Sequence, residues 1–338
     1  MKVESESDSG ISVDERLLRA EQIYVSYPRL EELRGKITRC HQLSQYAAEP
    51  ECLFIKGPTG TGKTTLYRRY EQQHPRRETD DGTIVPVLSA TIPVPATVKS
   101  LVTKLLVNLG DPAAERGTTD SRTLRLSTLL KNCRVELIIL DEFQHFIDRD
   151  SQRVLQNVSD WLKNLLNETS IPIVLVGMPN SDLVLEANPQ LRRRFSARES
   201  LEPFGWEPVA RRDDFRRFLK VLDSKLPFAR SSHLADHAMA LRFYYATDGV
   251  VANVMKLARR AAGLAVEGAL DELTLPVLAQ AYEECLASNN RGKSNPFAAE
   301  VDSLSVQTYQ EQMIPPKATN NRKKTKRRQA SASEVLHR

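Results

Sequence analysis

Residues 57–64 are Gly57-Pro58-Thr59-Gly60-Thr61-Gly62-Lys63-Thr64, and they match the phosphate-binding loop pattern G-x-x-x-x-G-K-[ST] at every fixed position. The apolar run 52–56 before them is typical of a strand, and residues 65–70 after them can continue as a helix. The motif needs this strand–loop–helix context. The sequence therefore predicts an α/β fold in which a parallel sheet is flanked by helices and a nucleotide binds at this loop.

The loop supplies several groups that suit a nucleotide such as ATP. Its glycines let backbone N–H groups turn toward phosphate oxygens, and the N-terminus of the next helix adds positive potential. We expect Lys63 to reach the β- and γ-phosphates and the Thr64 hydroxyl to hold Mg²⁺. The predicted ATP-binding residues of the loop are Gly57, Pro58, Thr59, Gly60, Thr61, Gly62, Lys63, Thr64 and Thr65.

A second motif follows at residues 135–142, where a largely apolar run ends in Asp141 and Glu142, the Walker B arrangement. The carboxyl end of such a buried strand opens onto the nucleotide crevice. We expect Asp141 to bind the nucleotide's Mg²⁺ and Glu142 to polarise the water that attacks the γ-phosphate. After a complete phosphate loop, this pair predicts an ATPase.

The composition sets the broad class of the protein. The 338 residues carry a net charge of +5 and are 41% hydrophobic, which is typical of a globular protein with room for two domains. The apolar runs are too short to cross a membrane, and the polar, acidic N-terminus does not resemble a signal peptide, so we expect a cytoplasmic protein. The cysteines lack metal-ligand spacing and are expected to be free thiols: Cys40, Cys52, Cys133 and Cys285.

The chain divides into four predicted parts. Residues 1–45 form an N-terminal segment with two helices, 46–205 the α/β nucleotide-binding domain, 206–288 a small all-helical lid, and 289–338 a flexible basic tail. The first helix is expected to begin at Ser12 and stop before Pro28. The second is expected to begin at Pro28, with Leu30, Leu33, Ile37 and Leu43 on one face.

Within the α/β domain, hydrophobic spacing predicts strands at 83–90 and 171–177 and helices at 96–109, 121–131 and 152–167. Residues 74–82 are charged and rich in turn formers. Pro86 is awkward in a central strand, so strand 83–90 is expected at an edge or end of the sheet. The apolar face of helix 121–131 includes Leu124, and Trp161 is expected in the core.

Three polar residues are candidates for further catalytic roles. Asn180, just after strand 171–177, can touch the γ-phosphate or orient the attacking water; the alternative is a plain Pro-Asn turn. Arg193 and Arg194 follow a short helix. Either one can act as an arginine finger that reaches a neighbouring subunit's ATP, or the arginine cluster is simply a solvated basic face.

The tail contains two segments of interest. Residues 295–297, Asn-Pro-Phe, form a possible docking segment. Residues 321–328 carry six positive charges, which are consistent with DNA binding, with a partner-docking arm or with a solubilising end.

Together these features resemble the AAA+ ATPases, and within them the TniB/TnsC-type transposition regulators, over roughly residues 15–290. Asp141-Glu142-Phe143-Gln144-His145-Phe146 is the most selective match. The other stretches of the resemblance are Tyr27-Pro28-Arg29, Glu49-Pro50-Glu51-Cys52, Val176-Gly177-Met178-Pro179 and Leu191-Arg192-Arg193-Arg194-Phe195.

The resemblance implies a bacterial, nucleoid-associated protein that binds ATP and assembles as a homo-oligomeric ring or helical filament around duplex DNA. Such proteins link a TniQ-type target selector, or a CRISPR-associated complex, to a DDE transposase, and hydrolysis disassembles the filament. DNA backbone contacts would come from the region of Lys99 and Thr118-Thr119, although Lys99 can equally be an ordinary exposed lysine. One departure is that no arginine stands in Gly249-Val250-Val251-Ala252-Asn253, where Lys256 is the nearest cation, so hydrolysis is expected to be slow or partner-stimulated.

Two other functions fit the same motifs. One is an AAA+ loader or remodeller that acts on a protein client such as a replicative helicase. The other is a nucleotide-switched scaffold with little turnover. Stimulation of ATP turnover by duplex DNA of any sequence would distinguish the regulator from both.

Overall fold

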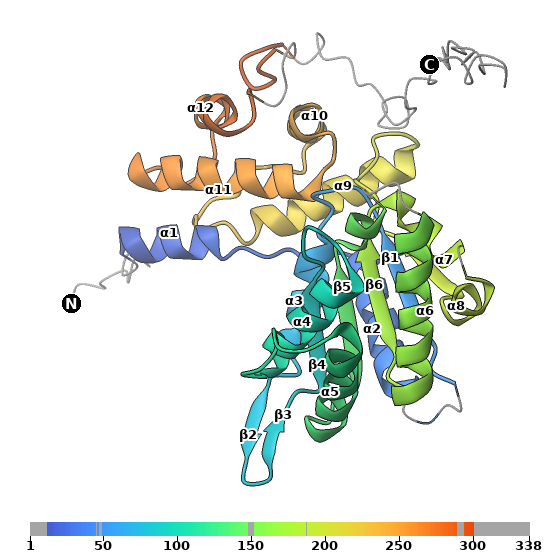
Figure 1. Ribbon diagram of the computed structural model, residues 1–338. Helices are drawn as coiled ribbons and strands as arrows, with labels where there is room; N and C mark the ends of the chain where they lie inside the picture. Colours follow the sequence, from blue (N-terminus) through green and yellow to red (C-terminus); the bar gives the residue numbers. More distant parts are fainter. Residues whose placement is uncertain are drawn as a thin grey trace, which may run out of the picture. The chain divides into compact units, whose positions relative to one another are not determined.

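In the computed structural model, strands and helices alternate in the first part of the chain and helices alone follow (Figure 1). The basic run 321–328 lies outside the described residues. The described residues are 12–44, 46, 49–147, 152–186, 188–288 and 294–300.

The centre of the α/β part is a parallel five-stranded sheet with the order β4-β5-β6-β1-β7. Its strands are β1 (Leu53–Lys56), β4 (Val87–Thr91), β5 (Leu137–Asp141), β6 (Ile173–Gly177) and β7 (Ala197–Ser200). β6 separates β1, which leads into the phosphate loop, from β5, which carries the two carboxylates. β4 is an edge strand, as Pro86 predicts.

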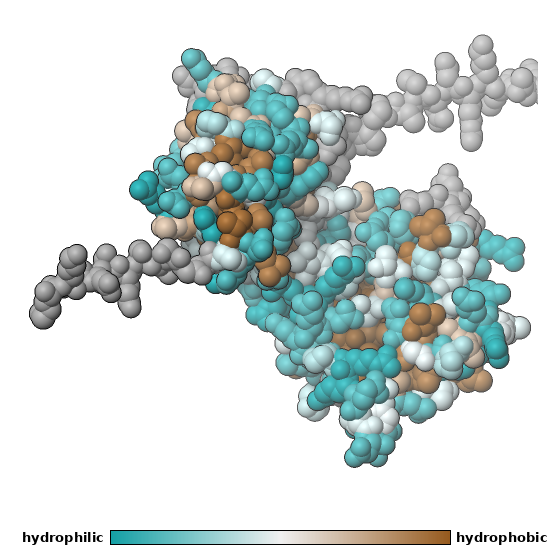
Figure 2. Space-filling view, turned by 90° about the vertical axis from the view of Figure 1, so that its left-hand side faces the viewer, coloured by the Kyte–Doolittle hydropathy of each residue, from teal (hydrophilic) through white to brown (hydrophobic). Residues whose placement is uncertain are grey.

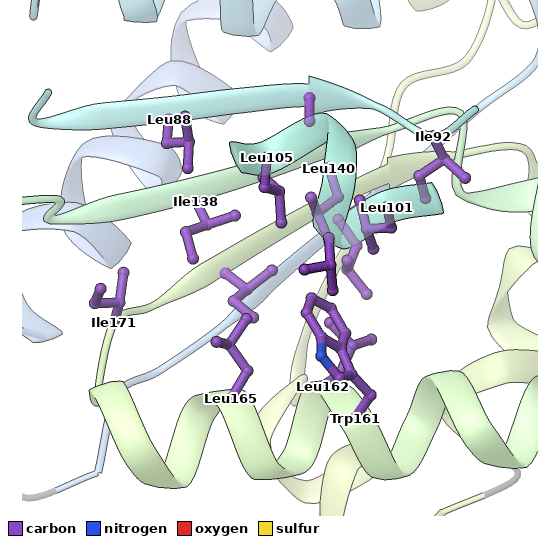
Figure 3. Close-up of a cluster of buried hydrophobic side chains, with 14 of the residues drawn as sticks. Leu88, Ile92, Leu101, Leu105, Ile138, Leu140, Trp161, Leu162, Leu165 and Ile171 are labelled. Atoms are coloured by element: carbon purple, nitrogen blue, oxygen red, sulfur yellow. The ribbon is translucent and has the colours of Figure 1, made fainter. Parts of the chain in front are cut away.

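One face of the sheet packs on α4 (Val98–Leu109), α5 (Thr119–Asn132) and α6 (Gln152–Thr169). Figure 3 shows this core, in which Leu88 and Ile138 of the strands face Leu105 of α4 and Leu162 of α6. Trp161 is 8% exposed and belongs to the same core, as predicted. On the α2 (Pro28–Ser44) and α3 (Lys63–Gln72) side, α2 contacts β1 and α3 contacts β4.

Some local predictions differ from the structure. Residues 74–90 form an antiparallel hairpin of β2 (Arg77–Thr79) and β3 (Gly82–Ile84), followed by β4, because Pro86 splits the expected strand 83–90 in two. Leu43 and Leu124, which were placed on the apolar faces of their helices, are 52% and 72% exposed.

The short elements between β5 and β7 bring loops toward the carboxyl ends of the strands. They are the 3-10 turns η1 (Phe143–Phe146) and η2 (Pro179–Ser181) and the helices α7 (Asp182–Glu186) and α8 (Pro189–Arg194).

After β7 the described chain is helical, which confirms the predicted lid. Its helices are α9 (Val209–Asp223), α10 (His237–Thr247), α11 (Val251–Glu267) and α12 (Leu275–Cys285). The first helix of the chain, α1 (Val13–Glu21), packs on α11. It ends earlier than predicted, and residues 22–27 continue without helix toward α2.

The segment 294–300, assigned to the tail by composition, packs against the lid. Phe297 is 4% exposed, and its ring lies 5.5 Å from that of Phe243 and 6.4 Å from that of Tyr282. Arg242 donates hydrogen bonds to the carbonyl oxygens of Pro296 and Ala299. The Asn-Pro-Phe stretch therefore docks within its own chain.

The surface in Figure 2 is largely hydrophilic, with hydrophobic side chains in small separate groups. No helix among the described residues is long and apolar enough to span a bilayer.

Candidate functional site

The phosphate loop joins β1 to α3, and its backbone requires glycine at several points. Gly60 and Gly62 have φ angles of +82° and +101°, in the left-handed region that other residues rarely adopt. A Cβ on Gly57 would lie 2.1 Å from the carbonyl oxygen of Leu201. The first turn of α3 leaves the N–H groups of Lys63, Thr64 and Thr65 without an acceptor inside the helix, and such groups form an anion site.

Lys63 is folded back onto the loop. Its Nζ donates hydrogen bonds to the carbonyl oxygens of Gly57, at 2.6 Å, and Pro58, at 2.7 Å. Burial lowers the pKa of Lys63, while the carboxylates of Asp141 and Glu142 act in the opposite direction.

The two predicted magnesium ligands lie side by side. Thr64 Oγ1 donates a hydrogen bond of 2.9 Å to Asp141 Oδ2. The bond connects the helix that follows β1 with the end of β5, although β6 lies between these two strands in the sheet. Asp141 is 2% exposed, and its other oxygen accepts the N–H of Glu142 at 2.8 Å. A hydroxyl beside a buried carboxylate is an oxygen donor set that suits Mg²⁺, so these residues fit the ion.

Glu142 occupies a strained turn at the end of β5. Its φ is +59°, which is unusual for a residue with a side chain. The strain is consistent with a functional position. Its carboxylate accepts a hydrogen bond from the side-chain amide of Gln144.

These groups surround a cavity of about 620 Å³ between the phosphate loop, residues 21–30 and the lid. The lining combines an apolar wall from the N-terminal segment with the loop backbone and cations from α11. The lining residues are Glu21, Ile23, Tyr24, Val25, Tyr27, Leu30, Thr59, Gly60, Thr61, Gly62, Lys63, Thr64, Thr65, Glu142, Met178, Val251, Ala252, Met255, Lys256, Arg259, Arg260 and Cys285.

The lid touches the phosphate loop directly. The N–H of Ala252 donates to the carbonyl of Gly60 at 2.9 Å, so a backbone contact occupies the position where the sequence lacks an arginine. Of the three α11 cations, Arg259 donates to the carbonyl of Ile23 at 2.9 Å and Arg260 pairs with Glu284. Lys256 lines the cavity as well.

An aromatic cluster connects the cavity wall to the lid. The ring of Tyr27 lies 5.0 Å from that of Phe204 and 5.7 Å from that of Phe218. Phe204 also contacts Phe215, which in turn contacts Tyr244 of α10. Burial raises the pKa of the Tyr27 hydroxyl, which keeps it neutral.

The remaining predicted catalytic residues are not part of the lining of this cavity. Asn180 is exposed in η2 and does not line it. Arg193 has a side chain that is 77% exposed and pairs with Glu49 at 3.0 Å. Arg194 is 18% exposed, lies 3.9 Å from Glu49 and donates to Asn167 at 3.0 Å. The roles of these three residues stay predictions.

The two predicted DNA-contacting residues share a different groove, of about 700 Å³, between the starts of α4 and α5 and one side of α6. Lys99 and Thr119 line it together with Asp120, Asp160 and Glu168. Lys99 also borders a second groove, which contains Lys104 and Arg122. The groove next to α6 thus has three carboxylates in its lining, whereas the second groove combines Lys99, Lys104 and Arg122 with a single carboxylate, Glu115.

The sequence does not reveal three features of the site. Residues 23–27 supply cavity wall, Gln144 contacts Glu142, and β7 borders the phosphate-loop strand. The only signal for Gln144 is its place in the Asp141–Phe146 motif, and β7 has four half-buried residues with no hydrophobic alternation.

Comparison with known proteins agrees with this geometry. The chain is similar to the ORC2 protein of Aeropyrum pernix in ADPNP–ADP complexes, with 17% identity, a TM-score of 0.57, and coverage of 82% of this chain and 74% of that chain. It is also similar to Cdc6p from Pyrobaculum aerophilum, with 16% identity, a TM-score of 0.58, and coverage of 82% of this chain and 74% of that chain. For the Aeropyrum pernix ORC1 protein in complex with DNA, the identity is 15%, the TM-score is 0.55, and the coverage is 80% of this chain and 69% of that chain. At such identities the likeness concerns the fold alone.

No curated protein sequence matches the chain. Residues 16–205 match the family described as bacterial TniB protein. Because this match spans more than half of the chain and includes both nucleotide motifs, the protein belongs to the TniB family.

Proposed function

We propose that this protein is an ATP-dependent, DNA-binding regulator of transposition that oligomerises on duplex target DNA. The observation that carries the nucleotide part is the hydrogen bond between Thr64 and Asp141 at the phosphate loop, with Glu142 next to it. The transposition part is supported by membership of the TniB family. Both ATP and duplex DNA occur in the bacterial cytoplasm, where we expect the protein to act.

In this proposal ATP binds with its phosphates in the loop. The loop N–H groups and Lys63 hold the phosphate charge, and Thr64 and Asp141 would hold Mg²⁺, which neutralises charge on the β- and γ-phosphates. Ile23, Val25 and Leu30 offer an apolar wall for the base. Glu142 accepts a proton from the attacking water, and its negative charge orients that water.

Assembly would complete the site from a neighbouring subunit. Of the two arginines considered as fingers, Arg193 is the freer, because an ion pair with the half-exposed Glu49 holds it only weakly. Arg194 is more buried and has a second partner in Asn167. We therefore favour Arg193 as the group that would reach a neighbour's γ-phosphate, where a guanidinium stabilises transition-state charge.

DNA binding is proposed for the exposed face of α4. Lys99 borders two grooves. The one that it shares with Lys104 contains one carboxylate, Glu115, whereas the one that it shares with Thr119 contains three, Asp120, Asp160 and Glu168. Phosphates are repelled by such carboxylates, so we place the DNA backbone on the Lys99–Lys104 side. Contacts of this kind do not depend on DNA sequence, as target capture at many sites requires. The TniQ-type selector and the DDE transposase would then bind the assembled protein.

The test is steady-state ATP turnover with and without duplex DNA of two unrelated sequences. Both DNAs are expected to raise turnover in the wild type. Glu142→Gln should reduce turnover on the order of 100-fold and lengthen the life of protein–DNA complexes. Glu186→Gln, which changes an exposed glutamate of α7, is the matched control.

Two results would contradict the proposal. One is turnover that responds to a protein client and not to DNA, which is the behaviour of a loader. The other is a Glu142→Gln variant whose ATP consumption and complex lifetime equal those of the wild type, which would indicate a nucleotide-switched scaffold.

A further inference from the structure

Gln144 connects three parts of the nucleotide site. Its Nε2 donates a hydrogen bond to the Glu142 carboxylate, and its Oε1 accepts the N–H of Met178 at 3.1 Å. Met178 follows β6 and lines the nucleotide cavity, where its Sδ accepts a hydrogen bond of 3.5 Å from Thr59 Oγ1. One side chain thus links the Walker B carboxylate to the end of β6 and, through it, to the phosphate loop.

The surroundings of Gln144 hold it in place. The side chain is 9% exposed, and it sits in the turn η1 between Phe143 and Phe146, which are both fully buried and whose rings lie 5.6 Å apart. These rings anchor the turn in the core. The anchored turn and the two hydrogen bonds of the Gln144 amide therefore restrict its movement.

Gly177 leaves the space that the amide needs. A Cβ at this position would lie 3.2 Å from Gln144 Oε1 and 2.6 Å from Ser181 Oγ. The carbonyl of the same glycine accepts the N–H of Gly57, at 3.1 Å, so the end of β6 is bonded to the first residue of the phosphate loop as well.

We infer that Gln144 is a positioning residue for hydrolysis: it fixes the Glu142 carboxylate through one oxygen, leaves the other oxygen for the attacking water, and ties this orientation to the phosphate loop through Met178. The inference rests on the proposed ATPase function. A carboxylate at a strained turn with no such partner would sample several rotamers, and small errors in the position of a catalytic group reduce the rate strongly.

The experiment uses the full-length protein with ATP, Mg²⁺ and duplex DNA, and measures turnover against ATP concentration. Affinity is measured separately with a fluorescent ATP analogue. Gln144→Met keeps the length of the side chain and removes both hydrogen bonds. Gln144→Glu keeps the acceptor for Met178 but cannot donate to Glu142 when ionised. Gln156→Met, on the exposed side of α6, is the matched control.

Both Gln144 variants are expected to lower kcat by about tenfold or more, with nucleotide affinity within about twofold of the wild type. In a Glu142→Gln background, Gln144→Met should change turnover by less than about twofold, because the group it positions is already lost. If Gln144 had only a structural role, Gln144→Met would lower the affinity for the nucleotide, and it would reduce turnover by the same factor in the Glu142→Gln background as in the wild type.

Unchanged or increased turnover in Gln144→Met, in a wild type that hydrolyses ATP, would overturn this inference and leave the proposed ATPase function intact. So would equal losses in the wild-type and Glu142→Gln backgrounds. A wild-type protein that binds the analogue but shows no turnover with DNA would refute the proposed ATPase function itself, and the inference with it.

Discussion

Gly249→Ala tests how firmly the lid is fixed to the nucleotide site. Gly249 has a φ of +68° and lies just before α11. A Cβ at this position would lie 2.1 Å from the carbonyl oxygen of Phe204 and 3.1 Å from the Tyr244 ring. The carbonyl oxygen of Gly249 also accepts the N–H of Phe204 at 3.0 Å. The added methyl group therefore clashes with backbone that is itself hydrogen-bonded.

The cost has two sources. An L-residue in the left-handed region loses about 1–2 kcal/mol, and overpacking a tight site adds about 1–3 kcal/mol. We expect the variant to be about 2–5 kcal/mol less stable, which lowers the midpoint of thermal unfolding by at least about 3 °C. Because α11 carries the Ala252 contact to Gly60, ATP affinity should fall as well.

The assay is thermal and urea unfolding of the purified protein, with ATP affinity as a second measurement. Gly35→Ala is the matched control, because a Cβ on Gly35 has no atom within 4 Å and the residue lies inside α2. The control variant is expected to be about 0.5–1 kcal/mol more stable than the wild type. Equal stability of Gly249→Ala and the wild type would refute the account of how the lid is attached.

Three further outcomes follow from the site and its surroundings. Lys63→Ala should weaken ATP binding by at least about tenfold, because hydrogen bonds to charged groups contribute about 1.5–3 kcal/mol; equilibrium binding of labelled ATP would show it, and tight binding by the variant would refute the loop assignment. Lys99→Ala should reduce the slope of log K against log salt for duplex DNA by about 1, whereas an unchanged slope would remove Lys99 from the interface. Burial lowers the pKa of His41 below its ordinary value of 6.5 against the opposing effect of Glu136, so the folded state binds fewer protons than the unfolded state. The contribution of His41 to the free energy of unfolding is therefore fully present above about pH 6.5 and is lost as the pH falls below this value. Urea unfolding at several pH values measures this dependence, and the free energy of unfolding of a His41→Asn variant should vary less with pH.

The nucleotide site could be predicted from the sequence because its motifs are local. Each motif fixes a turn and the residues beside it, and the parallel strands then bring Thr64 and Asp141 together at one edge of the sheet. The contacts that the sequence did not predict join segments that are distant along the chain. Gln144 reaches Met178, and Ala252 reaches Gly60, through positions that no periodicity marks.

Helix ends and exposed faces were also harder to predict. The first helix was expected to continue until just before Pro28, yet Ile23 and Val25 line the nucleotide cavity from a segment without helix. Leu124 fits the apolar spacing of α5 but faces the groove next to α6, where no other element covers it among the described residues. Hydrophobic spacing identifies an amphipathic helix but does not reveal which part of its face is covered.

The most direct test of the central claim is electron microscopy of the purified protein with duplex DNA, with and without a non-hydrolysable ATP analogue. We predict rings or filaments on the DNA only when the analogue is present, and their loss in Lys63→Ala. Particles that remain monomeric and unbound in both conditions would contradict nucleotide-dependent assembly on DNA.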